Sequence, residues 1–297
     1  MRELLEKYTN RFSRFLVIDG MQIHYRDEGE GTPILLLHGA FSSLHTFNSW
    51  AAELKRNGFR VVRLDAPGFG LTGPHPDHIY TIPNHLRILS IFLDMLGIQR
   101  CHIAGSSLGG WLTWEFALKY PDRTDKIILI DAAGFLDPQS IPLPFRMAQT
   151  PFLSRVIKYA INRPMLETFV RQVYFDQSKV TELLIDRYYD LVTRPGNPEA
   201  FMILVNGKFK DNTPHLRQVK APALVMWGND DKWLPVENAY RFHKMLPDSQ
   251  LIVYKNVGHL TMEEIPEITV KDALRFLLPP PTLSNTKQTI AGLEKAP

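Results

Sequence analysis

The sequence predicts an α/β protein with a mostly parallel sheet of about eight strands and helices on both faces. Short apolar runs that suit buried strands alternate with helical segments along most of the chain. Glycine-containing turns follow several of these runs. The chain has 297 residues, of which 44% are apolar, so it can bury a large core without disulfide or metal support. One large domain with an insertion is expected.

The sheet is expected to begin with an antiparallel hairpin. Val17–Asp19 and Met21–Arg26 are separated by a glycine turn. Four apolar runs that alternate with helical segments follow it: Ile34–Leu37, Arg60–Leu64, Cys101–Ala104 and Ile127–Ile130. This alternation is typical of parallel strands joined by crossover helices. The helix that starts at Leu108 should end near Pro121, because proline cannot continue a helix.

The segment between residues 134 and 211 differs from the rest of the chain. It contains seven prolines and short amphipathic stretches, but no run typical of a buried strand. Because it is too long for a plain loop, residues 135–210 are predicted to form a helical insertion. The core then consists of residues 1–134 and 211–278. Residues 279–297 begin with three prolines and continue as a polar tail that is expected to be disordered.

The run Gly105-Ser106-Ser107-Leu108-Gly109 lies where a predicted strand meets a predicted helix. A serine on such a sharp turn has a strained backbone, so residues two positions before and after it must have almost no side chain. The turn also directs the Leu108 amide and the first helical turn at the space above Ser107. Ser107 is therefore predicted to be a nucleophile that attacks a carbonyl carbon.

Two later strands are followed by the partners that a serine nucleophile needs. Ala223–Trp227 leads into a loop with Asp231, and Leu251–Tyr254 leads into a loop with His259. A serine hydroxyl requires a general base, and that base requires an acid to orient it. Since Ser107, Asp231 and His259 all follow strands, they are expected to meet at the carboxyl edge of the sheet.

A second oxyanion donor is expected after the run Ile34–Leu37. The backbone beyond His38-Gly39 can turn an amide toward the nucleophile, beside the amide of Leu108. Either Ala40 or Phe41 would supply it. His38 itself is interpreted as holding this loop by hydrogen bonds. Asp65, in the turn Asp65-Ala66-Pro67-Gly68-Phe69-Gly70, is interpreted as a carboxylate that bonds the turn.

Over roughly residues 15–278 the chain resembles the α/β-hydrolase family, in its serine carboxylesterase and lipase-like branch. Four blocks occur in the family's order: Leu36-Leu37-His38-Gly39-Ala40-Phe41, Asp65-Ala66-Pro67-Gly68-Phe69-Gly70, Gly105-Ser106-Ser107-Leu108-Gly109-Gly110, and Gly258-His259 with Glu264 and Pro266-Glu267. The resemblance implies that the acid stands three residues after Gly228, which is Asp231. Asp131 is the alternative acid, since some relatives place it one strand earlier.

The resemblance also implies that residues 135–210 form a helical cap over the active site. A cap must bury its underside, so an apolar pocket for a small apolar acyl substrate is expected. Each aromatic side chain in this segment also has the simpler interpretation of packing one helix on another. The candidate pocket residues are Phe145, Met147, Phe152, Trp233 and Leu260.

The predicted function is hydrolysis of a carboxylic ester through an acyl-enzyme, with no cofactor. The first alternative is cleavage of carbon–carbon bonds in vinylogous diketones formed by ring cleavage. Hydrolases of that kind share the triad but often have tryptophan directly after the catalytic histidine, where this chain has Leu260. A non-catalytic ligand receptor with a hydrolase fold is the second alternative. Dehalogenases and epoxide hydrolases of this fold use aspartate at the position of Ser107.

Composition excludes several other classes. The net charge of +3 is spread along the chain, which gives no reason to propose nucleic acid or an anionic membrane as a partner. No stretch approaches the roughly 20 apolar residues of a membrane span, and residues 1–7 lack the apolar block of a signal peptide. A cytoplasmic location is expected. Cys101 is the only cysteine, and prolines flank His75 and His78, so neither a disulfide nor a metal site is predicted.

Overall fold

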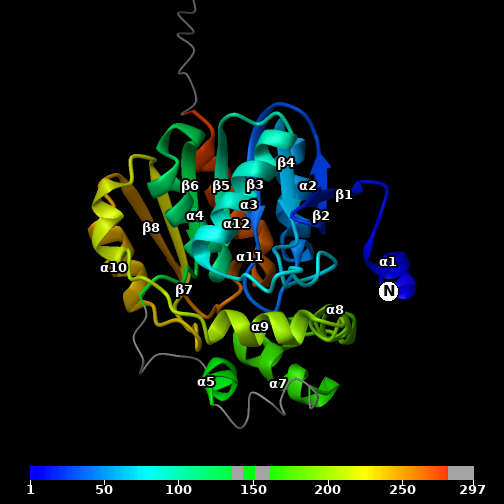
Figure 1. Cartoon of the computed structure of the whole chain (residues 1–297). Coiled ribbons are helices and arrows are strands. Elements are labelled where there is room, and N and C mark those ends of the chain that lie inside the picture. Colours follow the sequence, from blue (N-terminus) through cyan, green and yellow to red (C-terminus); the bar gives the residue numbers. More distant parts are fainter. Residues whose placement is uncertain (136–142, 151–160, 280–297) are drawn as a thin grey trace, which may run out of the picture.

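A central sheet with helices on both faces forms the core of the protein (Figure 1). The structure is a computed structural model, and it describes residues 1–135, 143–150 and 161–279. The eight strands are β1 (Ser13–Ile18), β2 (Met21–Glu28), β3 (Thr32–Leu37), β4 (Phe59–Leu64), β5 (Cys101–Ser106), β6 (Thr124–Ile130), β7 (Ala223–Gly228) and β8 (Ser249–Tyr254). Their order in the sheet is β1-β2-β4-β3-β5-β6-β7-β8.

Only the β1–β2 and β2–β4 pairs are antiparallel, and all pairs from β4 to β8 are parallel. The predicted fold class is therefore confirmed. The hairpin strands are longer than expected, because β1 begins at Ser13 and β2 continues to Glu28. Most of β1 is not fully buried, so its sequence lacks the apolar run by which the other strands were found.

Residues that alternate along a strand supply two separate cores. Leu35 and Leu37 belong to the core beneath α3 (Ile82–Met95), α4 (Leu108–Lys119) and α10 (Glu237–Met245). Ile34 and Leu36 belong to the core on the opposite face. That face is covered by α2 (Asn48–Arg56) and α12 (Pro266–Leu277). The alternation follows from the two-residue period of a strand and leaves the loops at the strand ends free to build a site.

The remaining helical elements are short or lie in the segment predicted as an insertion. They are α1 (Arg2–Tyr8), α5 (Leu143–Gln149), α7 (Arg163–Val173), α8 (Glu182–Val192), α9 (Asn197–Val205) and α11 (Thr261–Glu264), with 3-10 turns η1 (Leu44–Phe47), η2 (Pro121–Arg123), η4 (Gln177–Lys179) and η5 (Thr213–Gln218). As expected, α4 ends at Lys119, shortly before Pro121.

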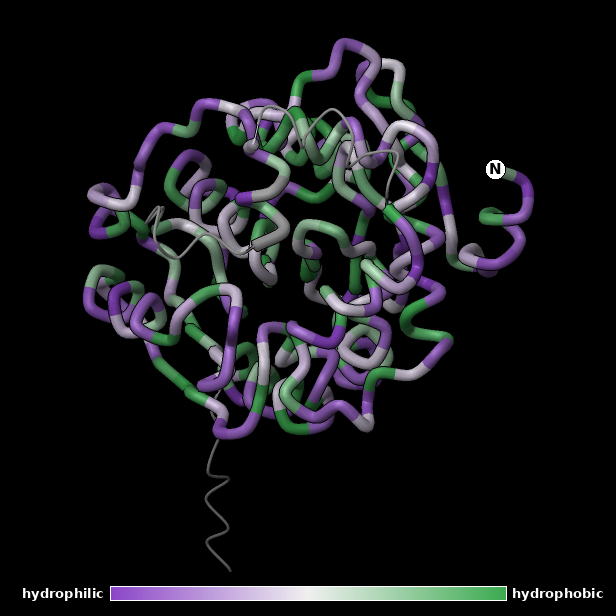
Figure 2. Tube along the Cα trace, turned by 90° about the horizontal axis from the view of Figure 1, so that it is seen from below, coloured by the Kyte–Doolittle hydropathy of each residue, from purple (hydrophilic) through white to green (hydrophobic). Residues whose placement is uncertain are grey.

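Helices α5, α7, α8 and α9 lie together on one side of the sheet, below it in Figure 1. Viewed from that side, hydrophilic stretches of the chain lie mainly around the periphery (Figure 2). The described part of residues 135–210 contains helices and no strand. Residues 280–297, which make up nearly all of the predicted tail, lie outside the described residues. In the part of the chain that is described, no helix is long and apolar enough to cross a membrane.

Asp65, directly after β4, joins three parts of the core. Its Oδ2 atom accepts hydrogen bonds from the Leu71 amide and from Nδ1 of His24, both at 2.8 Å, and its Oδ1 atom accepts from the Leu44 amide at 2.7 Å. Burial alone would raise the pKa of this carboxyl, but the charges and hydrogen bonds of neighbouring histidines, His24 above all, bring its pKa below the ordinary value. Asp65 thus bonds its turn, as the sequence suggested.

Replacing Asp65 with asparagine is expected to lower the free energy of unfolding by about 3–5 kcal/mol, because the amide loses the charge in a fully buried network. The pKa is lowered in the folded state, so this contribution is present above the unfolded pKa of about 3.9 and is lost as the pH falls further. Urea unfolding at pH 7 and pH 3 measures both effects. Asp125→Asn, in an exposed pair with Arg100, is the control, and an equally small change in both variants would contradict the assignment.

Candidate active site

Ser107 occupies a tight turn between β5 and α4. Its backbone has φ 54° and ψ −117°, a conformation that side chains rarely adopt. A Cβ atom on Gly105 would lie 2.1 Å from the carbonyl oxygen of Gly109, and one on Gly109 would lie 2.1 Å from that of Leu37. Both positions therefore require glycine. The Ser107 amide donates to the carbonyl of Ile130 at 3.0 Å, which fixes the turn to β6.

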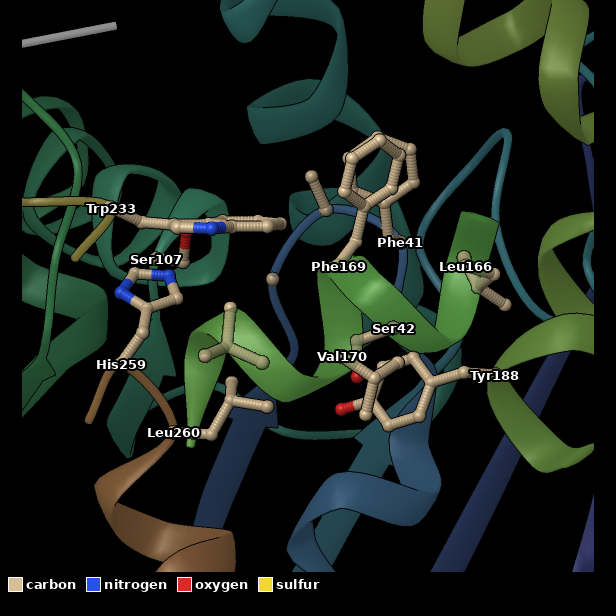
Figure 3. Close-up of a pocket in the computed structure, with 13 residues that line it drawn as sticks. Phe41, Ser42, Ser107, Leu166, Phe169, Val170, Tyr188, Trp233, His259 and Leu260 are labelled. Carbon is tan, nitrogen blue, oxygen red and sulfur yellow. The ribbon is translucent and has the colours of Figure 1, made fainter. Parts of the chain in front are cut away.

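His259 and Asp231 come together beside Ser107. Nδ1 of His259 lies 2.7 Å from Oδ2 of Asp231, and both side chains are buried. The other carboxylate oxygen of Asp231 accepts from the amides of Trp233 and Leu234, at 2.7 and 2.9 Å. Figure 3 shows the imidazole ring of His259 directed toward the Ser107 hydroxyl, and both residues line one cavity. The geometry is that of a nucleophile, a base and an orienting acid.

Asp131, the alternative acid, makes different contacts. It is completely buried after β6, and its Oδ1 atom accepts from the Gly228 amide at 2.8 Å. Its Oδ2 atom lies 3.5 Å from the Thr261 amide. Burial, and then the charge of Asp231, raise the pKa of Asp131 well above its usual value. The raised pKa favours the protonated form of Asp131, which links the strand end before Asp231 to the loop after His259, while Asp231 bonds the imidazole.

The loop after β3 passes directly over the nucleophile. A Cβ atom on Gly39 would lie 2.9 Å from Cβ of Ser107. Phe41, two residues further on, has φ 60°, and Gly39, Ala40 and Phe41 all line the cavity. The Leu108 amide begins α4, so it has no partner within the helix. These positions agree with an oxyanion hole made by Leu108 with Ala40 or Phe41.

His38 holds this loop in place. Its Nε2 atom accepts from the Ala66 amide at 2.9 Å, and its Nδ1 atom lies 2.7 Å from the carbonyl of Gly39. Burial lowers the pKa of His38, so the ring stays neutral and keeps both roles at once. The interpretation of His38 as a loop-holding residue therefore fits its contacts.

The cavity and the solvent-open space at its mouth together hold about 410 Å³, and the wall is mostly apolar. Two of the candidate pocket residues, Trp233 and Leu260, line it. Phe145 instead packs against Phe41 and Trp233, with ring centroids 5.7 and 5.8 Å away. The Met147 side chain and Phe152 lie outside the described residues.

Sequence reasoning missed most of the opposite wall. It is formed by Ser42, by Leu166, Phe169, Val170 and Val173 of α7, and by Tyr188 of α8. The α7 residues have the spacing of one helix face, so the amphipathic pattern was the available signal. It did not indicate which surface that face covers. Among the described residues, no cluster of three or more His, Cys, Asp or Glu side chains is arranged to hold a metal ion.

Comparison with known proteins identifies the family. Residues 32–266 match the family model described as the alpha/beta hydrolase fold. A 2-hydroxy-6-oxononadienedioate/2-hydroxy-6-oxononatrienedioate hydrolase of Dechloromonas aromatica is 32% identical over 286 residues, which cover 92% of this chain and 97% of the relative. A 2-hydroxy-6-oxo-6-phenylhexa-2,4-dienoate hydrolase of Burkholderia cepacia is 29% identical over 293 residues, covering 93% and 99% of the two chains.

A solved serine hydrolase involved in carbazole degradation has a TM-score of 0.76 and 26% identity, and the match covers 89% of this chain and 98% of that structure. The chain therefore belongs to the α/β-hydrolase family. The comparisons support the prediction that the protein is a hydrolase. The names of these sequence relatives, however, fit the alternative of carbon–carbon bond cleavage better than the predicted cleavage of esters.

The two buried acids should respond differently to substitution. Asp231→Asn is expected to lower kcat by about 10⁴, because the amide cannot hold the imidazole in the correct tautomer. Asp131→Asn should retain most of kcat, because His259 bonds Asp231 and the new side chain keeps an oxygen for the Gly228 amide. The measurement is kcat for p-nitrophenyl acetate, with circular dichroism to confirm folding. The reverse ranking would assign the catalytic role to Asp131.

Proposed function

We propose that this chain is a serine hydrolase that attacks a carbonyl carbon with Ser107. His259 takes the proton of the hydroxyl, and Asp231 orients the ring and stabilises the imidazolium that forms. The amides of Leu108 and of Ala40 or Phe41 bind the oxyanion. The observation that carries the proposal is the hydrogen bond between His259 and Asp231 beside Ser107, in one cavity. Water releases the acyl group, so no cofactor enters the scheme.

The first candidate substrate class is a vinylogous diketone of the 2-hydroxy-6-oxo-dienoate type. The dienol first shifts its 2-hydroxyl proton to the carbon next to the ketone, which gives the diketo tautomer. Attack of Ser107 on the ketone of that tautomer breaks a carbon–carbon bond, since the leaving carbon departs as a conjugated enolate that takes the proton from the His259 imidazolium. Water then cleaves the acyl-enzyme to a carboxylic acid. This candidate is supported by relatives named for such substrates that match over more than 90% of both chains.

The second candidate is an uncharged carboxylic ester, and the cavity wall favours it. No lysine or arginine lines this cavity among the described residues. A dienoate carboxylate would lose its hydration there without gaining a cation. An ester needs the same proton from His259, in this case for the departing alkoxide. Leu260 also stands where carbon–carbon hydrolases often have tryptophan. The cap role of residues 135–210 and a cytoplasmic location stay predictions.

A fluorophosphonate is expected to label Ser107, and peptide mass spectrometry locates the modified residue. Ser107→Ala should abolish labelling and lower kcat for p-nitrophenyl butyrate by about 10⁶. Ser106→Ala, one residue away, is the matched control that should still be labelled. Absence of labelling in the folded wild-type protein would support the ligand-receptor alternative, and labelling at another residue would refute the site.

The two substrate classes are separated by kcat/KM for a panel that contains a 6-phenyl dienoate and p-nitrophenyl esters of increasing acyl length. If the first candidate is correct, kcat/KM for the dienoate should exceed kcat/KM for the best ester by at least about tenfold. The cavity would then bind the transition state of the dienoate reaction more tightly than that of ester hydrolysis. A panel in which an ester exceeds the dienoate would select the second candidate.

A further inference from the structure

A polar cluster that the mechanism does not use lies behind the cavity wall. Its centre is Glu263, in the short helix α11 that follows His259. Oε2 of Glu263 accepts a hydrogen bond from the Thr46 hydroxyl at 2.8 Å and from the Tyr188 hydroxyl at 3.0 Å. Oε1 of Glu263 is paired with Arg187 of α8. The side chains of Arg187 and Glu263 are only 19% and 13% exposed.

Tyr188 connects this cluster to the cavity. Its ring lines the wall together with Ser42, and its hydroxyl reaches Glu263 behind that wall. Figure 3 shows the hydroxyl ends of Ser42 and Tyr188 close together, away from the end that holds Ser107 and His259. The cavity therefore has a catalytic end and a second end with hydroxyl groups. The charged pair lies next to the second end.

Arg187 forms an ion pair with Glu263. Burial would lower the pKa of the guanidinium, but the charge of Glu263 outweighs it, so the pKa of Arg187 is raised. Arg187 therefore stays charged, and its guanidinium is directed at the Glu263 carboxylate. A cation held by a protein carboxylate is not free to bind the carboxylate of a substrate, because breaking a buried pair leaves one charge uncompensated.

We propose that Glu263 is a specificity-determining residue that lowers the cavity's affinity for carboxylates by holding Arg187. With Glu263 present, the second end offers hydroxyl groups to an uncharged part of the substrate. This inference rests on the proposed function, since it assumes that acyl substrates of Ser107 fill the cavity. It bears on both substrate candidates, because a dienoate carries a carboxylate and a simple ester does not.

The test compares two esters of equal acyl length, p-nitrophenyl butyrate and mono-p-nitrophenyl succinate. Glu263→Gln keeps the shape of the side chain and an acceptor oxygen, but it releases Arg187. We expect this variant to raise the ratio of kcat/KM for the succinate to that for the butyrate by about tenfold, through a new charge-assisted contact with Arg187. An unchanged ratio would overturn the inference.

Two further variants test whether a raised succinate-to-butyrate ratio comes from the Arg187–Glu263 pair. In the double variant Glu263→Gln with Arg187→Gln the gain should disappear, whereas a gain that persists would refute the role of Arg187. Glu182→Gln is the matched control, because Glu182 of α8 also pairs with an arginine, Arg163 of α7, but its side chain is 71% exposed. Its ratio should equal that of the wild type.

Arg187→Gln alone gives an answer even if Glu263→Gln fails to fold. In this variant the ratio of kcat/KM for the succinate to that for the butyrate should not fall below the wild-type ratio. The reason is that, under the proposal, Arg187 does not contact substrate in the wild type. A selective tenfold loss of succinate turnover would show that Arg187 already binds carboxylates, and would overturn the inference. Failure of the proposed function looks different, because Ser107 would then resist the fluorophosphonate in every folded variant.

Discussion

The structure depends on the crowded backbone around Ser107. Its positive φ angle is unfavourable for a residue with a side chain, and such strain persists only where the surroundings over-determine it. The surroundings here are the β3 and β6 strand ends on either side of β5. Ser107 donates to Ile130 and accepts from Ala133, while Gly109 packs against Leu37 without room for a Cβ atom. The parallel register of three strands thereby fixes the direction of one hydroxyl.

Three buried carboxyl groups complete the same edge of the sheet, each with its own role. Asp65 is held ionised by His24 and two amides, and it ties down the loops around β4. Burial raises the pKa of Asp131, which joins the ends of two strands, whereas Asp231 supports the imidazole. Each of the three accepts a hydrogen bond from a backbone amide at or beyond a strand end, where the sheet offers that amide no carbonyl partner. All three residues are aspartates, so the contacts around each carboxyl group determine which one can orient the base.

The fold and triad were predictable because they depend on local signals. The strands that lead to Ser107, Asp231 and His259 each contain a short apolar run followed by a turn, so these three residues were placed at one edge without knowledge of packing. The choice between Asp131 and Asp231 depends on which carboxylate reaches the ring, a tertiary distance that spacing along the chain does not contain. The wall from α7 was missed for the same reason, since a helix face does not reveal its partner.

The substrate question also lies outside the triad. Ester and carbon–carbon cleavage share the attack by Ser107, the oxyanion and the proton delivered by His259, and they differ in the group that leaves. In the proposed mechanism the same three residues would serve either reaction, so discrimination would come from the part of the cavity that contacts the rest of the substrate. That part is built by α7, α8 and the loop after His259. If Glu263 holds Arg187 as proposed, a single charged pair beside Tyr188 would shift this balance while the catalytic end stays unchanged.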